Sequence, residues 1–98
     1  MKTYMICIDL PSEITEEFVS LIPKQRKKID DLMDKGIVLN YSLAIDRSKV
    51  WVTLLPSSEN KAMDILATFP MIHFMNPEIV ELAFHNSLSN ELPKLIMN

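Results

Sequence analysis

The sequence predicts a small α+β domain, in which one antiparallel sheet carries its helices on a single face. Segments with strand and helix periodicity follow one another in the order β-α-β-β-α-β. Apolar residues make up 48% of the 98 residues and there is one glycine, a composition typical of a compact chain. No stretch rich in Ser, Gly or Pro interrupts this order, so we predict a single domain over residues 1–86.

The N-terminal third of the chain predicts a strand and a long helix. Residues 2–9 alternate between two faces, and the apolar face carries Tyr4, Ile6 and Ile8. Thr15 is a suitable N-cap for the helix, and Gly36 provides its stop. Pro23 lies inside this helix and has no N–H to donate, so we expect a kink or two helical pieces there. The apolar stripe of the helix consists of Phe18, Leu21, Ile22, Ile29, Leu32 and Met33.

A β-hairpin is predicted next. In its first strand one face carries Leu39, Tyr41 and Leu43, and the other carries Val38, Asn40 and Ser42. The polar residues 46–49 have the composition of a turn. Alternation then resumes in a second strand, whose apolar face carries Val50, Val52 and Leu54.

The remaining elements complete a known arrangement. A second helix is predicted between Pro56 and Pro70. Residues 78–84 predict the last strand, with an apolar face of Val80, Leu82 and Phe84. Two β-α-β halves with both helices on one face form the ferredoxin-like βαββαβ fold, which has a four-stranded antiparallel sheet.

The second face of this sheet predicts self-association. It would present a mixture of apolar and polar side chains: Met5, Cys7, Ser42, Trp51, Thr53, Ile79, Glu81 and Ala83. Surplus apolar surface on a small domain usually lies in a subunit interface. We therefore expect the sheet of a second subunit to cover this face, giving a dimeric α+β barrel, as a homodimer or a higher homo-oligomer.

Charge and composition limit the kinds of partner and the cellular compartment that we expect. The net charge of −3 argues against a nucleic-acid partner and against anionic membranes, and no apolar run approaches the roughly 20 residues that a membrane-spanning helix needs. One cysteine, Cys7, fits a reducing compartment, so we expect a cytoplasmic protein. One thiol and two distant histidines give no metal-ligand spacing, so we expect no metal and no other cofactor.

Several short motifs fall in an order that is known from one family. They are Leu-Pro at residues 10–11, a basic-rich first helix that ends in Lys-Gly, the hairpin, and Pro-Ser-Ser-Glu at residues 56–59. The sharpest is F-P-M-I-H-F-M-N-P-E-I at residues 69–79, followed by A-F-H at residues 83–85. In these motifs the chain, from residue 1 to about residue 86, resembles the muconolactone isomerase-like family (muconolactone delta-isomerase and its relatives).

The resemblance implies both an assembly and a chemistry. It implies a ferredoxin-like subunit, dimers formed through the sheet, and a cofactor-free proton shift on a small unsaturated lactone or acid. It also implies that the C-terminal arm, residues 87–98, docks on a neighbouring subunit. Where the family enzymes have an acid–lysine pair on the first helix, this chain has Gln25 and Arg26. Because a glutamine is not a useful base, an isomerase would take its base from Glu81 or His85.

Four residues are candidates for ligand binding. Gln25 interrupts the apolar stripe of the first helix, so its amide must find partners or a ligand, or else lie at the edge of the stripe. Arg26 can clamp a carboxylate or belong to a solvated helix face. Tyr41 and Trp51 can form an aromatic wall for a flat ligand or pack in the core.

Two residues are candidates for catalysis. Glu81 is expected on the second sheet face, where burial would raise its pKa, although a wet barrel interior would leave it solvated. His85 lies at the end of the last strand, where it can border a pocket or face water. His73 is interpreted as a hydrogen-bonded loop histidine.

Three classes of function stay open after the sequence is read: a cofactor-free isomerase, a non-catalytic small-molecule binder and a structural oligomer. The feature that distinguishes them is a cavity beside Gln25, Tyr41 and Trp51. A cavity bordered by a carboxylate or an imidazole favours the enzyme, and a cavity without either favours the binder.

Overall fold

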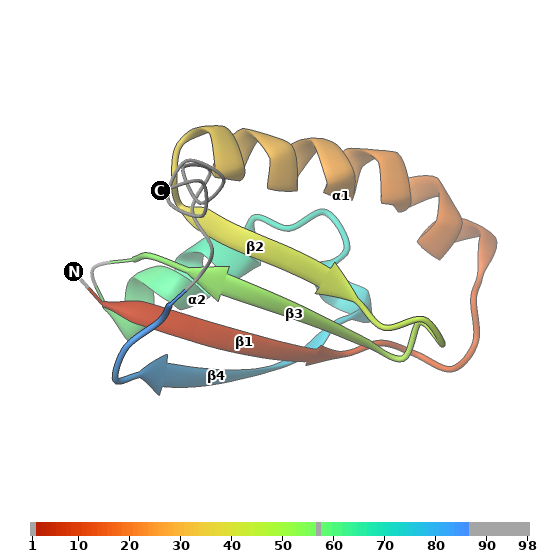
Figure 1. Ribbon diagram of the computed structural model, residues 1–98. Helices are drawn as coiled ribbons and strands as arrows, with labels where there is room; N and C mark the ends of the chain where they lie inside the picture. Colours follow the sequence, from red (N-terminus) through yellow and green to blue (C-terminus); the bar gives the residue numbers. More distant parts are fainter. Residues whose placement is uncertain (1, 57, 87–98) are drawn as a thin grey trace, which may run out of the picture.

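The β-α-β-β-α-β order is confirmed by the computed structural model, which describes residues 2–56 and 58–86 (Figure 1). The elements are β1 (Thr3–Asp9), α1 (Glu16–Asp34), β2 (Val38–Leu43), β3 (Lys49–Leu54), α2 (Glu59–Ala67), the short 3-10 helix η1 (Ile72–Phe74) and β4 (Asn76–Leu82). The strands form one antiparallel sheet in the order β2-β3-β1-β4; in Figure 1 α1 runs above β2 and α2 lies behind the strands. This is the predicted ferredoxin-like fold.

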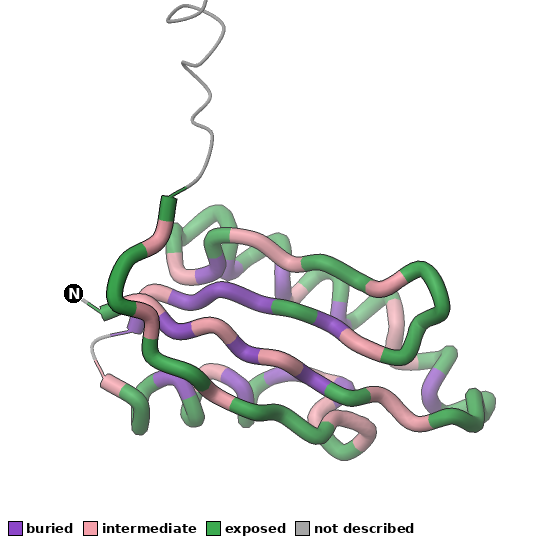
Figure 2. Tube along the Cα trace, turned by 60° about the horizontal axis from the view of Figure 1, so that its bottom comes forward, coloured by how far each residue is buried: buried purple, intermediate pink, exposed green. Residues whose placement is uncertain are grey.

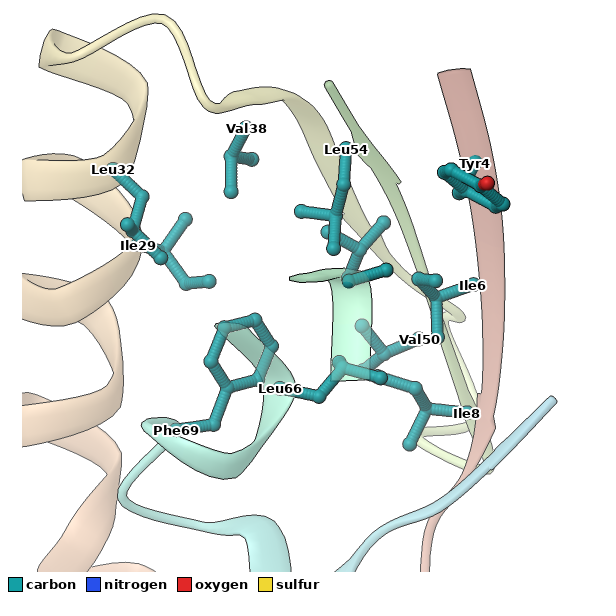
Figure 3. Packing of buried hydrophobic residues seen from close by; sticks show 12 residues of the cluster. Tyr4, Ile6, Ile8, Ile29, Leu32, Val38, Val50, Leu54, Leu66 and Phe69 are labelled. Carbon is teal, nitrogen blue, oxygen red and sulfur yellow. The ribbon is translucent and has the colours of Figure 1, made fainter. Parts of the chain in front are cut away.

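The hydrophobic core lies between the sheet and the two helices. The inward-facing residues of β1 lie opposite those of β3, because directly paired residues of antiparallel strands share a face. All six are at most 2% exposed: Tyr4, Ile6, Ile8, Val50, Val52 and Leu54. The helical layer contributes Ile29 and Leu32 from α1 and Leu66 and Phe69 from α2 and its C-terminal end (Figure 3).

Both ends of α1 form as the sequence predicts. The Phe18 N–H donates to Thr15 Oγ1 over 3.1 Å, which satisfies one of the free N–H groups of the first turn. At the other end Gly36 has φ +73°, and Ile37 N–H donates to Leu32 O over 2.9 Å, so the chain leaves the helix in a Schellman motif.

Pro23 does not divide α1 into two pieces, which was one of the two outcomes predicted from the sequence; the other, a kink, stays a prediction. The helix is continuous from Glu16 to Asp34. Pro23 and Val19, whose carbonyl would otherwise accept the missing N–H, are both exposed. Water can therefore satisfy that carbonyl, and the helix can continue past the proline.

A β-bulge in β2 changes the predicted faces of the hairpin. Val38 pairs with Leu54, but Asn40 pairs with Thr53, so Leu39 is the extra residue. The bulge brings Val38, which is 3% exposed, and Tyr41 to the same helix-facing side. The simple alternation predicted from the sequence was wrong here, because it placed these two residues on opposite faces.

The faces of β4 are also the reverse of the prediction. Ile79 lies opposite Ile6 and Glu81 lies opposite Tyr4, so both are on the helix-facing side. Val80 lies opposite Met5 on the other side, and Phe84 lies beyond the strand and is 78% exposed. The expectation that Val80, Leu82 and Phe84 point into the core was wrong. Apolar residues occur at both odd and even positions of this strand, so alternation alone did not fix its phase.

The sheet face that points away from the helices carries most of the residues predicted for it. Met5, Cys7, Trp51 and Thr53 lie there, as their pairing shows. Trp51 is 37% exposed and Val80 is 47% exposed on this face. The segment 83–86, which follows β4, turns back across one end of the face (Figures 1 and 2). The predicted arm, residues 87–98, lies outside the described residues.

We predict that Thr15→Ala destabilises the protein by about 1 kcal/mol, because the first turn of α1 loses its side-chain acceptor. Ser12→Ala is the matched control, since Ser12 is exposed and precedes the cap. Urea unfolding followed by circular dichroism measures both variants. Equal stability of the two would show that the cap contributes nothing.

Candidate functional site

A cavity lies between the N-terminal half of α1 and the end of the sheet where β2 turns into β3. Its volume is about 430 Å³, within the range of small-ligand sites. The N-terminal half of α1 reaches over this end of the sheet, near the hairpin turn (Figure 1). Eight of the lining side chains are apolar: Leu10, Ile14, Phe18, Val19, Ile22, Leu43, Val50 and Met71. The polar ones are Gln25, Arg26, Tyr41 and Arg47.

Gln25 is the buried polar group of this cavity. It lies on the inward side of α1, one turn before Ile29, and is 3% exposed. Its Oε1 accepts a hydrogen bond from the Met71 N–H over 3.2 Å, which ties α1 to the connection between α2 and β4. Because only the amide oxygen can accept this bond, the other amide atom is the nitrogen. That Nε2 is buried and has no hydrogen-bond partner among the described residues.

Tyr41 lines the cavity from the middle of β2, which the bulge turns toward the helices. Burial raises the pKa of its phenol, and the Gln25 amide opposes part of this increase. The Gln25 Nε2 atom is nevertheless not in ordinary hydrogen-bond geometry with the phenol. Tyr41 therefore stays protonated in neutral solution and can donate a hydrogen bond to a ligand.

Arg26 and Arg47 bring positive charge to the cavity from α1 and from the hairpin turn. Both residues are exposed, and neither forms an ion pair within residues 2–56 and 58–86. Arg47 has φ +63°, a left-handed conformation that is uncommon for an arginine. Its N–H donates to Ala44 O over 2.9 Å, which fixes the turn.

Asp46 and Asp30 are close to these arginines in the sequence, but neither forms an ion pair with them. The Asp46 carboxylate accepts hydrogen bonds from the N–H and hydroxyl of Ser48, and these bonds hold its pKa below the usual value. Asp30 borders a second, more open hollow of about 350 Å³ that shares Arg26 and Tyr41 with the cavity. Among residues 2–56 and 58–86, neither a carboxylate nor an imidazole lines the main cavity.

Trp51 does not take part in this cavity. It pairs with Ser42 and Cys7 on the face of the sheet away from the helices, whereas Tyr41 is on the helix-facing side. The aromatic wall of Tyr41 and Trp51 considered from the sequence does not form.

The two catalytic candidates lie away from the cavity. Glu81 is on the helix-facing side, so its predicted place on the second sheet face was wrong. Its Oε1 accepts a hydrogen bond from the buried Tyr4 hydroxyl over 3.3 Å, and Lys2 Nζ lies 3.8 Å away. Burial, reinforced by Glu81, raises the pKa of Tyr4. His85 follows β4 and is half-buried, with Nε2 buried and unpaired among the described residues. Neither residue lines the cavity.

Sequence reasoning missed Arg47 and Met71 as cavity residues. Arg47 belongs to a polar turn, and no pattern marks it as left-handed or as adjacent to α1. Met71 contributes a backbone N–H, a group that every residue except proline has. His73 is exposed in η1, and the hydrogen bond predicted for it stays a prediction.

We predict that Tyr41 weakens the fold at alkaline pH. Burial raises its folded-state pKa above the ordinary tyrosine value of 10.0. Its contribution to stability is therefore complete below pH 10 and is lost as the pH rises through the folded-state pKa. The difference in unfolding free energy between wild type and Tyr41→Phe should be constant up to about pH 9 and should fall above pH 10. Urea titrations across this range measure it, and a difference that stays constant to pH 11.5 would contradict the prediction.

Three further findings bear on identity. Neither helix of the described chain is long and apolar enough to cross a membrane. Within residues 2–56 and 58–86, no three His, Cys, Asp or Glu side chains are grouped so that they could hold a metal ion. No protein-family model matches the sequence, and no curated protein matches it.

Proposed function

We propose that this protein binds a small, largely apolar molecule in the cavity between α1 and the sheet. The observation that carries the proposal is the buried Gln25 Nε2, a donor in a largely apolar cavity for which the described part of the chain supplies no partner. Leaving such a donor unpaired costs about 1 to 3 kcal/mol. A ligand with an acceptor oxygen beside this atom would remove that cost.

Binding without catalysis is favoured by the polar groups that line the cavity. A proton shift needs a base within hydrogen-bond reach of the carbon acid. The lining offers an amide, a protonated phenol and two guanidinium groups, none of which is a base in neutral solution. The isomerase alternative would need Glu81 or His85, and these residues are elsewhere.

The resemblance to muconolactone isomerase-like proteins supplies the first compounds to test. It rests on the motifs of residues 69–79 and 83–85 and on the ferredoxin-like fold. Small unsaturated lactones and acids are therefore the first set of compounds to test, called the first panel below. We also propose that the chain belongs to the muconolactone isomerase-like family.

We expect one or more compounds of this panel to raise the melting temperature of the protein. A ligand present at one hundred times its Kd stabilises the folded state by about 2.7 kcal/mol. Leu43→Trp should abolish the shift, because Leu43 lines the cavity and a larger side chain would fill it. Leu39→Trp is the matched control, since Leu39 is a similarly exposed leucine of the same strand outside the cavity.

The same experiment separates binding from catalysis. Each compound that stabilises the protein is incubated with it and followed by NMR for conversion. Turnover would favour the isomerase, and binding without turnover would support the proposal. Equal shifts in the Leu43→Trp and Leu39→Trp variants would place the ligand elsewhere.

We also propose that the protein forms a homodimer through the sheet face that carries Trp51. Support comes from the exposure of Trp51 and Val80 beside the half-buried Met5 and Cys7. A large apolar side chain on such a face would stabilise the protein most when the sheet of a second subunit buries it.

Sedimentation at micromolar concentration should give the mass of two or more chains for wild type and of one chain for Trp51→Glu. Ile45→Glu is the control, because Ile45 is fully exposed in the hairpin turn and should leave the mass unchanged. A wild-type protein that sediments as one chain would exclude this assembly.

A further inference from the structure

Hydrogen-bond donors outnumber acceptors among the polar side chains of the described residues that line the cavity. Arg26 and Arg47 have donors and no acceptor. The Gln25 Oε1 already accepts a hydrogen bond from the Met71 N–H, whereas its Nε2 donor has no partner among the described residues. The Tyr41 phenol can donate and also accept. Such a lining is suited to a ligand that carries acceptors.

The two charged side chains that line the cavity are both positive, in a chain whose net charge is −3. Asp46, next to Arg47, is hydrogen-bonded to Ser48, and the other neighbouring cation, Lys49, is paired with Asp9. Asp30 lies one turn after Arg26 but borders the adjoining hollow and forms no ion pair with it. Two guanidinium groups without partners in the described chain are therefore available to an anion.

The backbone at Arg47 adds an independent observation. Its φ of +63° is a conformation that glycine and asparagine adopt at lower cost than arginine. Strained residues of this kind are concentrated where a side chain is used for binding. Here the strained residue is an arginine that lines the cavity.

We propose that Arg26 and Arg47 make the cavity selective for an organic anion with one acidic group and an apolar body. The guanidinium groups bind the acidic group, the apolar walls bind the body, and Gln25 Nε2 donates to a ligand oxygen. Arg47 is then a residue that determines specificity. This inference rests on the proposed binding function and adds the class of ligand.

Three probes with the same eight-carbon chain test the selectivity: octanoate, octanol and octylamine. We expect octanoate to bind at least tenfold more tightly than octanol, and octylamine to bind most weakly, in calorimetric titrations at pH 7. Raising the salt concentration should weaken octanoate binding and leave octanol binding nearly unchanged, since salt screens exposed charges.

Single substitutions then identify the residues. Arg26→Gln and Arg47→Gln should each lower octanoate affinity about fivefold or more without changing octanol affinity. Lys24→Gln is the control, because Lys24 is an exposed cation of α1 that does not line the cavity. Arg47→Asn suits the left-handed backbone, so a loss of octanoate binding in this variant cannot be attributed to misfolding.

The possible failures are distinguishable. Equal binding of octanoate and octanol, or an equal loss in the Lys24→Gln control, would overturn the anion selectivity and leave the binding function intact. Absence of octanoate binding, while an uncharged lactone of the first panel still stabilises the protein, would do the same. If octanol, octanoate and the whole panel all failed to bind, the proposed binding function itself would be overturned.

Discussion

The pairing of β1 with a neighbour on each side is the constraint on which the rest of this structure depends. β1 is central, and its contacts with β3 and β4 decide which residues of all three strands face the helices. A shift of one residue would expose Tyr4, Ile6 and Ile8, which are almost completely buried. The same pairing directs Trp51 away from the cavity and places Glu81 beside the Tyr4 hydroxyl.

Gln25 connects the packing of the helical layer to the cavity. One end of its amide holds the backbone at Met71, so α1 and the segment after α2 are joined by a buried hydrogen bond. The other end is left without a partner among the described residues. A leucine here would extend the apolar stripe of α1, but it would leave the Met71 N–H buried without an acceptor. The amide therefore has a structural role whatever occupies the cavity.

The order of elements could be read from the sequence because each signal is local. Thr15 caps α1, Gly36 ends it, and the two-residue period of β1 and β3 agrees with their pairing. The faces of β2 and β4 could not be read in this way. A bulge at Leu39 breaks the period of β2, and β4 has apolar residues on both faces, so tertiary pairing decides both.

The candidate site was only partly accessible to sequence reasoning, for the same physical reason. Gln25 was recognisable because a polar residue interrupts an apolar stripe, and it lies together with Arg26 and Tyr41 as one group around the cavity. Trp51, Glu81 and His85 were assigned from strand phase or from position in the chain, and they lie outside it. Arg47 lines the cavity because of the backbone conformation of the hairpin turn, and composition alone does not reveal that conformation.

The bulge at Leu39 also makes one wall of the cavity insensitive to the loss of a residue. Val38 and Tyr41 face the helices with one surplus residue between them. A chain that lacked this residue would pair regularly with β3 and would keep both side chains on the same side. The tyrosine would then keep its position in the wall of the cavity.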